Sequence, residues 1–176
     1  MNAPHSAGRR RALLALGGAT LLAGCGFQLR GARPLPFDSI YLNMYQYSEL
    51  AAAIRRQIRA NGNTIVTDKA EDAQVRLEVL ADRKEKVILA LNTQGKVREY
   101  QLRHRFIFRL VDVKTGQEAL PNNEIFLYRD LAFDDTQLLA KEQEEILLYR
   151  DMLNDLVQQL LRRLSAAKMP AAAPTP

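Results

Sequence analysis

Apolar and polar residues alternate along several stretches of this 176-residue chain, and such alternation predicts strands with one buried face. The stretches run from Ser39 to Gln46, from Ala73 to Asn92 and from Tyr100 to Leu110, with shorter strands expected at 63–67 and 125–133. The alternation is most regular from Tyr100 onward, where one face is apolar and the opposite face carries three arginines and Ile107. That apolar face consists of Tyr100, Leu102, His104, Phe106, Phe108 and Leu110.

Two other stretches carry apolar residues every three or four positions, which predicts amphipathic helices. In the first, Ser48 is a suitable N-cap and Gly62 a suitable end, with a buried face of Leu50, Ile54 and Ile58. The second runs from about Gln137 to Ala166. Acidic residues crowd its start and arginines its end, an order that suits the helix dipole.

The order of these elements predicts the fold class. A strand, a helix and a strand between 39 and 67 favour two parallel strands joined by a crossover. The later strands follow turns at Asn92–Gly95 and at 114–117, where turn-forming residues gather. We therefore expect an α+β fold, a two-layer sandwich in which two helices pack on one face of a mostly four-stranded mixed sheet.

The N-terminus has the pattern of a secretory signal rather than of a folded element. Arg9, Arg10 and Arg11 precede an apolar run of 12 residues, from 12 to 23, whereas a helix that crosses a bilayer needs roughly 20. The alternatives are a buried helix, which the glycines of this run weaken, and a twin-arginine signal, after which no cofactor motif follows. We interpret the segment as a general secretory signal peptide.

Cys25 is the only cysteine in the chain and follows this run directly. The sequence Leu22-Ala23-Gly24-Cys25 resembles the lipobox of bacterial lipoproteins. That resemblance implies cleavage before Cys25, lipidation of its thiol and attachment to a membrane through two or three acyl chains. A reactive or redox cysteine is the alternative, although a lone thiol cannot close an intrachain disulfide. Lipoproteins of this kind that lack an aspartate directly after the cysteine are sorted onward to the outer membrane. Because residue 26 is a glycine, the resemblance implies that this protein is anchored in the periplasmic leaflet of the outer membrane.

These features divide the chain into four expected segments. Residues 1–24 form a cleaved signal peptide, 25–37 a lipidated tether, 38–167 a single domain and 168–176 a disordered tail rich in alanine and proline. Three of the 25 basic residues lie in the signal, leaving 22 against 20 acidic residues and a net charge of about +2. We therefore expect no binding of nucleic acid.

The mature sequence has no recognisable catalytic, metal or cofactor motif. His104 is its one histidine, and none of its three serines stands in a nucleophile elbow. We expect His104 to be a core histidine bonded to a neighbour, and the acids near the start of the second helix to serve the helix dipole rather than a metal. An enzyme with an unrecognised carboxylate site is the alternative, but the sequence predicts no enzyme, metal or cofactor.

The arginines on the outer face of the central strand leave two interpretations open. Arg103, Arg105 and Arg109 can pair across strands with acids such as Glu78 and Asp82. They can also contact phosphate groups, which arginine forks fit well.

Several short motifs together resemble the lipopolysaccharide-assembly lipoprotein family, LptE. The segment from Cys25 to Gly31 is similar to the mature start of that family, and Ile54–Gly62 to its first helix and asparagine-glycine end. Glu99–Gln101, after a glycine turn, resembles the entry to its central strand, and its last helix resembles residues 139–142 and 159–164. The resemblance extends from Cys25 to about residue 164.

The resemblance implies a sandwich of two helices and four strands seated in the lumen of a large outer-membrane β-barrel of the LptD type. There it would plug the lipopolysaccharide translocon and scaffold its assembly, and a polar, mixed-charge surface suits such a lumen. It also implies contact of basic residues with the phosphates of lipid A, for which the matching positions are Lys96, Arg98 and Lys141. The alternative is a periplasm-facing lipoprotein interaction module without lipopolysaccharide contact.

Overall fold

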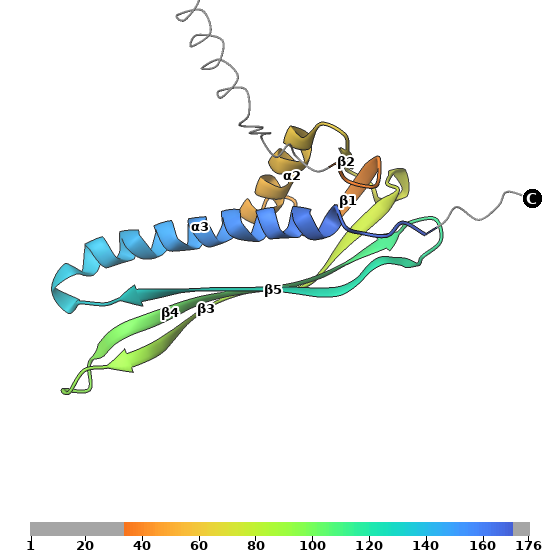
Figure 1. Cartoon of the computed structure of the whole chain (residues 1–176). Helices are drawn as coiled ribbons and strands as arrows, with labels where there is room; N and C mark the ends of the chain where they lie inside the picture. The colour runs from red at the N-terminus through yellow and green to blue at the C-terminus, as the bar shows by residue number, and fades with distance from the viewer. Residues whose placement is uncertain (1–33, 171–176) are drawn as a thin grey trace, which may run out of the picture. The chain divides into compact units, whose positions relative to one another are not determined.

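A computed structural model describes residues 34–170 (Figure 1). Cys25 and the signal segment lie outside these residues. The strands are β1 (Ser39–Asn43), β2 (Ile65–Thr67), β3 (Val75–Leu91), β4 (Val97–Asp112) and β5 (Glu118–Ala132), and the helices are α2 (Glu49–Asn61) and α3 (Leu138–Leu164), with short 3-10 turns at Ala70–Asp72 and Asp135–Gln137. Within the described residues, neither helix has the length and hydrophobicity needed to cross a membrane.

The sheet has five strands in the order β2-β1-β3-β4-β5. β1 pairs in parallel with β2 and with β3, whereas β3, β4 and β5 pair antiparallel. The predicted α+β class and the parallel β1–β2 pair are confirmed. The fifth strand is β2, which is only three residues long, so the expected four-stranded sheet differs little from the observed one.

The caps of α2 are those that the sequence predicts. Ser48 accepts a hydrogen bond from the backbone N–H of Ala51, and Gly62 ends the helix in a left-handed conformation with a φ of 80°. That conformation suits glycine because it has no Cβ.

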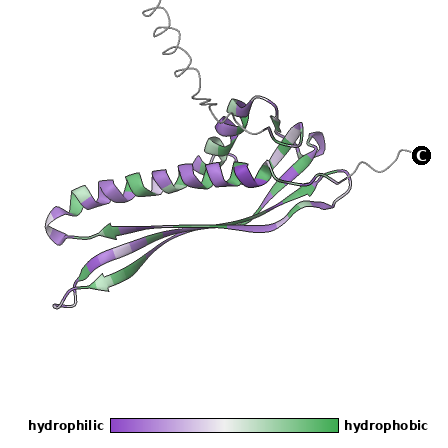
Figure 2. Cartoon of the chain, in the orientation of Figure 1, coloured by the Kyte–Doolittle hydropathy of each residue, from purple (hydrophilic) through white to green (hydrophobic). Residues whose placement is uncertain are grey.

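The core lies between the sheet and the two helices, which cover the same face of the sheet (Figure 1). Leu102, His104, Phe106 and the following even-numbered residues of β4 are buried, as their alternation predicts. Figure 2 shows the alternating colours of hydrophobic and hydrophilic residues along the strands. The core also contains Leu35 and Phe37, which belong to the segment expected as a tether.

Several strand boundaries differ from the expected ones, and β4 begins at Val97, three residues before Tyr100. β1 ends at Asn43 instead of Gln46, because the backbone turns there and the Met44 N–H bonds to the Leu42 carbonyl at 2.9 Å. β5 begins at Glu118, seven residues before the expected start at 125. Its first half contains Pro121, which interrupts the strand pattern but is tolerated in β5 because this strand is an edge of the sheet.

Candidate functional site

The turn between β3 and β4 fixes the position of Lys96. The Asn92 Oδ1 atom accepts hydrogen bonds from the backbone N–H groups of Gln94 and Lys96, both at 2.9 Å, and the Asn92 N–H donates to the Lys96 carbonyl at 2.8 Å. Gly95 has a φ of 76°, which glycine adopts without strain. We call the part of the molecule formed by this turn, Phe133 and the start of α3 the distal end.

The chain enters α3 next to this turn. The Phe133 N–H donates to the Arg98 carbonyl at 2.8 Å, which holds the end of β5 beside β4. The Asp134 carboxylate then accepts hydrogen bonds from the Thr136 N–H at 2.9 Å and from the Thr136 hydroxyl at 2.8 Å. These bonds stabilise the ionised form and lower the pKa of Asp134.

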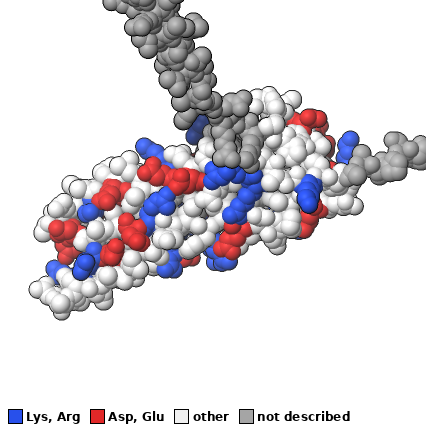
Figure 3. All heavy atoms as spheres, in the orientation of Figure 1, with Lys and Arg blue, Asp and Glu red and all other residues white. Residues whose placement is uncertain are grey.

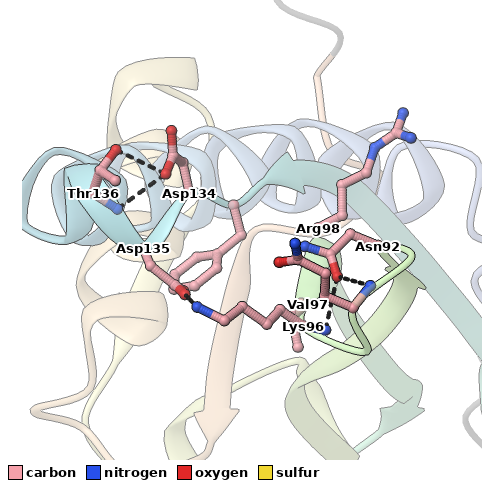
Figure 4. Close-up of a pocket in the computed structure, with 9 residues that line it drawn as sticks. Asn92, Lys96, Val97, Arg98, Asp134, Asp135 and Thr136 are labelled. Atoms are coloured by element: carbon pink, nitrogen blue, oxygen red, sulfur yellow. Dashed lines mark hydrogen bonds and ion pairs between the residues drawn. The ribbon is translucent and has the colours of Figure 1, made fainter.

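A polar cavity of about 340 Å³ lies between the turn and the 3-10 segment before α3 (Figure 4). Its lining residues are Asn92, Gln94, Lys96, Val97, Arg98, Phe133, Asp134, Asp135 and Thr136. The Lys96 Nζ atom lies 3.2 Å from a carboxylate oxygen of Asp135. Two of the predicted residues, Lys96 and Arg98, thus line one cavity.

A second cavity, of about 150 Å³, lies between the first turns of α3, the start of β4 and the end of β5, and it shares Phe133 with the first cavity. Its lining residues are Lys86, Tyr100, Leu131, Phe133, Leu138, Lys141, Glu142 and Glu145. Lys141, the third predicted residue, pairs with Glu144 at 2.8 Å. The wall of this second cavity is mainly apolar, and ammonium and carboxylate groups of α3 and β3 lie around it.

Lys86 is a basic residue of this region that the sequence analysis missed. Its Nζ atom lies 2.6 Å from Glu145 and 4.3 Å from the ring centroid of Tyr100, a cation–π distance. Lys86 pairs with Leu102 in the register of β3 and β4, which places its side chain on the helix-covered face. The β3–β4 register and the packing of α3 bring Lys86 close to Glu145, which is far from it in the sequence, so no local signal marks Lys86.

Two of the three arginines of the outer sheet face, Arg105 and Arg109, are held in ion pairs, whereas Arg103 donates to the side-chain oxygen of Gln101 at 2.8 Å. Arg109 bonds to Glu78 at 2.6 Å and to Glu118 at 3.1 Å, and Arg105 bonds to Glu124 at 2.7 Å. The Arg109 hydrogen bond, with help from Arg76, lowers the pKa of Glu78 although partial burial opposes this. The cross-strand interpretation is confirmed for Arg105 and Arg109, and Glu78 is a partner as expected.

Asp82 pairs with His104 rather than with an arginine. The His104 Nε2 atom lies 2.7 Å from the Asp82 Oδ1 atom, and the His104 ring is fully buried. The expectation of a core histidine bonded to a neighbour is confirmed. Over residues 34–170, no group of three or more His, Cys, Asp or Glu side chains is arranged to hold a metal ion.

Charges of both signs mix over the face shown in Figure 3 rather than forming a single basic patch. The acids near the start of α3 contribute to this mixture because Asp135, Glu144 and Glu145 pair with lysines. An anion at the distal end must therefore compete with carboxylates of the same chain.

The fold is that of several bacterial lipoproteins with solved structures. An uncharacterized lipoprotein B from Nitrosomonas europaea has 39% sequence identity and a TM-score of 0.69, over 80% of this chain and 91% of its own. A minor lipoprotein from Acinetobacter baumannii has 27% identity and a TM-score of 0.62, over 80% of this chain and all of its own. The chain thus has a lipoprotein-type sandwich domain.

Comparisons of sequence define the family. The lipopolysaccharide-assembly family LptE matches residues 37–164. LPS-assembly lipoproteins LptE from Yersinia enterocolitica and Photorhabdus laumondii are each 30% identical to this chain. These two matches cover 89% and 92% of this chain and 76% and 84% of the relatives. The chain belongs to the LptE family of lipopolysaccharide-assembly lipoproteins.

Proposed function

We propose that this protein plugs and scaffolds the barrel of the lipopolysaccharide translocon, and that its distal end binds the phosphates of lipid A. A lipid on Cys25 would anchor it in the periplasmic leaflet of the outer membrane, and a large β-barrel of the LptD type would enclose it. Membership of the family supports the role in lipopolysaccharide assembly. It also supports a binding and scaffolding role rather than catalysis.

The observation that carries the binding proposal is the meeting of distant basic residues around two adjoining cavities. Lys96 lies in the turn before β4, Arg98 lies near the start of β4, and Lys141 comes from α3, more than forty residues later. Ammonium and guanidinium groups bind phosphate well, and Lys96 is held on a turn whose backbone is fixed by Asn92. Apolar groups beside them, such as Phe133 and Leu138, suit a ligand that carries both phosphates and hydrocarbon.

The mixed-charge surface supports the plug. The lumen of an outer-membrane barrel is polar, so a protein inside it meets its walls through hydrogen bonds and ion pairs. The outer sheet face offers such groups, including Arg105, Arg109 and Glu124, each with part of its charge exposed.

Binding is tested with the full chain and purified lipopolysaccharide. Changing Lys96 and Lys141 together to glutamate should weaken binding at least ten-fold, because two attractions become repulsions. The matched control changes Lys69 and Lys114 to glutamate, which alters net charge equally away from the distal end. Equal affinity of the two double variants would remove Lys96 and Lys141 from the site.

A further inference from the structure

One edge of β3 is unpaired over most of its length. β1 pairs with β3 only through Ile40–Asn43, opposite Val75–Glu78, and then leaves the sheet. β3 continues to Leu91 beside β4 (Figure 1). Among the described residues, no strand lies along the other side of Val79–Leu91, which we call the free edge. An edge of this length is a template for another strand.

The register shows which backbone groups face outward. The Val113 N–H bonds to the Gln74 carbonyl, so odd-numbered residues of β4 direct their backbone groups toward β3. These odd residues lie opposite Arg83 and Glu85, because a register shift follows Val79. The N–H and C=O groups of the even-numbered residues Asp82, Lys84 and Lys86 therefore point away from β4, toward the free edge.

Apolar side chains stand at both ends of the free edge. Leu80, Ile88, Leu89 and Leu91 are each about half exposed, and the charged run from 82 to 86 separates Leu80 from the others. Natural edge strands are usually shielded by charges or by a covering segment. Here the charges occupy only the middle, so the two apolar ends remain available to a partner.

A cavity of about 280 Å³ opens where β1 leaves the sheet. Its lining residues are Asn43, Met44, Tyr45, Ser48, Leu50, Val79 and Asp82. A strand added along the free edge would begin in line with β1 and hence beside this cavity. Tyr45 and the largely exposed Tyr47 form an edge-to-face pair next to it, with ring centroids 5.7 Å apart. The cavity is large enough for an apolar side chain of the added strand.

Among the mixed charges of the free edge, Arg83 favours an acidic residue in the partner. Arg83 lies directly opposite Arg105, and like charges opposite each other destabilise a sheet. Arg105 is satisfied by Glu124 at 2.7 Å, whereas no acid among residues 34–170 forms an ion pair with Arg83. An aspartate or glutamate on an added strand, opposite Arg83, would balance this charge.

We propose that the free edge of β3 accepts an extended, acidic segment of a partner polypeptide as an added strand, with an apolar side chain of that segment in the cavity beside Met44 and Leu50. Main-chain hydrogen bonds would supply affinity, and the cavity and Arg83 would supply selectivity. The free edge adjoins the distal end, because Lys86 also lines the cavity that contains Lys141, but strand addition uses backbone groups of β3 and does not depend on lipid A binding.

The test places a photo-crosslinking amino acid at Leu80 in the full chain and irradiates cells that express it. We expect a crosslink to a different polypeptide, and sequencing of the crosslinked peptide should reveal an acidic residue within the attached segment. The same probe at Ile65, an exposed residue of the separate edge strand β2, is the positional control. Crosslinks only to lipid or to a second copy of this chain would overturn the proposal.

Two variants test the mechanism in the same cells. Arg83→Glu removes the like-charge opposition to Arg105, so it should leave the fold intact while lowering the crosslink yield at least ten-fold. Lys114→Glu, an equal charge change in a distant turn, should leave the yield unchanged. Lys84→Pro removes an outward N–H without touching the β4 ladder and should also abolish the crosslink. An undiminished yield in both Arg83→Glu and Lys84→Pro would overturn strand addition.

Discussion

The Nζ atom of Lys96 lies 3.2 Å from the carboxylate of Asp135, so a lysine proposed to bind phosphate is already paired within the chain. Both side chains are more than half exposed, and exposed pairs contribute only about 0–1 kcal/mol. A phosphate with a higher charge can therefore displace Asp135. The pair would keep Lys96 in place without blocking the ligand.

This relationship predicts that Asp135→Asn increases affinity for lipopolysaccharide. Loss of a competitor that contributes up to about 1 kcal/mol should tighten binding by a factor of up to about five. Equilibrium titration of the full chain with purified lipopolysaccharide measures the effect. Asp68→Asn, at an exposed position away from the distal end, is the control. An affinity that stays equal or falls would contradict the competition between Asp135 and the ligand.

A second prediction concerns the buried His104. Asp82→Ala leaves the His104 ring without its 2.7 Å partner, which should cost about 1–3 kcal/mol of unfolding free energy. His104→Leu should cost less, because it leaves no buried polar atom unpaired and Asp82 remains partly hydrated. Urea unfolding of both variants and of the control Asp68→Ala measures how much unfolding free energy each variant loses. A cost for Asp82→Ala no larger than for Asp68→Ala would show that this hydrogen bond contributes little.

A third prediction concerns acid. The pKa of Glu78 is lowered in the folded state, chiefly by the Arg109 hydrogen bond, from an ordinary value of 4.5. The ionised form is therefore favoured by folding, and its stabilisation is complete above that pH and lost as the pH falls through the lower folded value. Glu78→Gln should therefore lower the free energy of unfolding near pH 7. At pH 3, the difference in unfolding free energy between this variant and the parent chain should be smaller.

Urea unfolding at both pH values checks this prediction. Glu71→Gln, at an exposed position, should follow the parent chain at each pH. A destabilisation by Glu78→Gln that is the same at pH 7 and pH 3 would mean that packing, rather than the charge of Glu78, is responsible.

A fourth prediction compares two leucines of α3. Leu156 is fully buried, so Leu156→Ala should cost about 2–5 kcal/mol through lost burial and a residual cavity. Leu139 is 79% exposed, and Leu139→Ala should change stability by less than about 0.5 kcal/mol. Thermal or urea unfolding of the two variants measures both losses of unfolding free energy. Similar losses would contradict the assignment of the buried face of α3.

Local patterns were enough to predict most elements of the fold. The alternation around His104 and Phe106 gave β4, and the cap residues Ser48 and Gly62 gave the limits of α2. The early start of β5 could not be predicted in this way, because Pro121 argues against a strand unless the strand is known to be an edge. Edge position is a property of the whole sheet.

The candidate site was only partly predictable, because it too depends on how the whole sheet and α3 are arranged. Lys96, Arg98 and Lys141 were chosen through resemblance to a family, and whether they bind lipid A stays a prediction. Lys86 carries no local signal, because its closeness to Tyr100 and Glu145 depends on the β3–β4 register and on how α3 packs. The free edge of β3 likewise follows from where β1 stops, which is set by the turn at Met44.

The most direct test of the proposed function is isolation of the tagged full-length protein from its own envelope in mild detergent, followed by identification and quantification of the bound polypeptides by mass spectrometry. The plug and scaffold account predicts a large outer-membrane β-barrel in about equimolar amount. Recovery of the intact, membrane-anchored protein without such a barrel would contradict it.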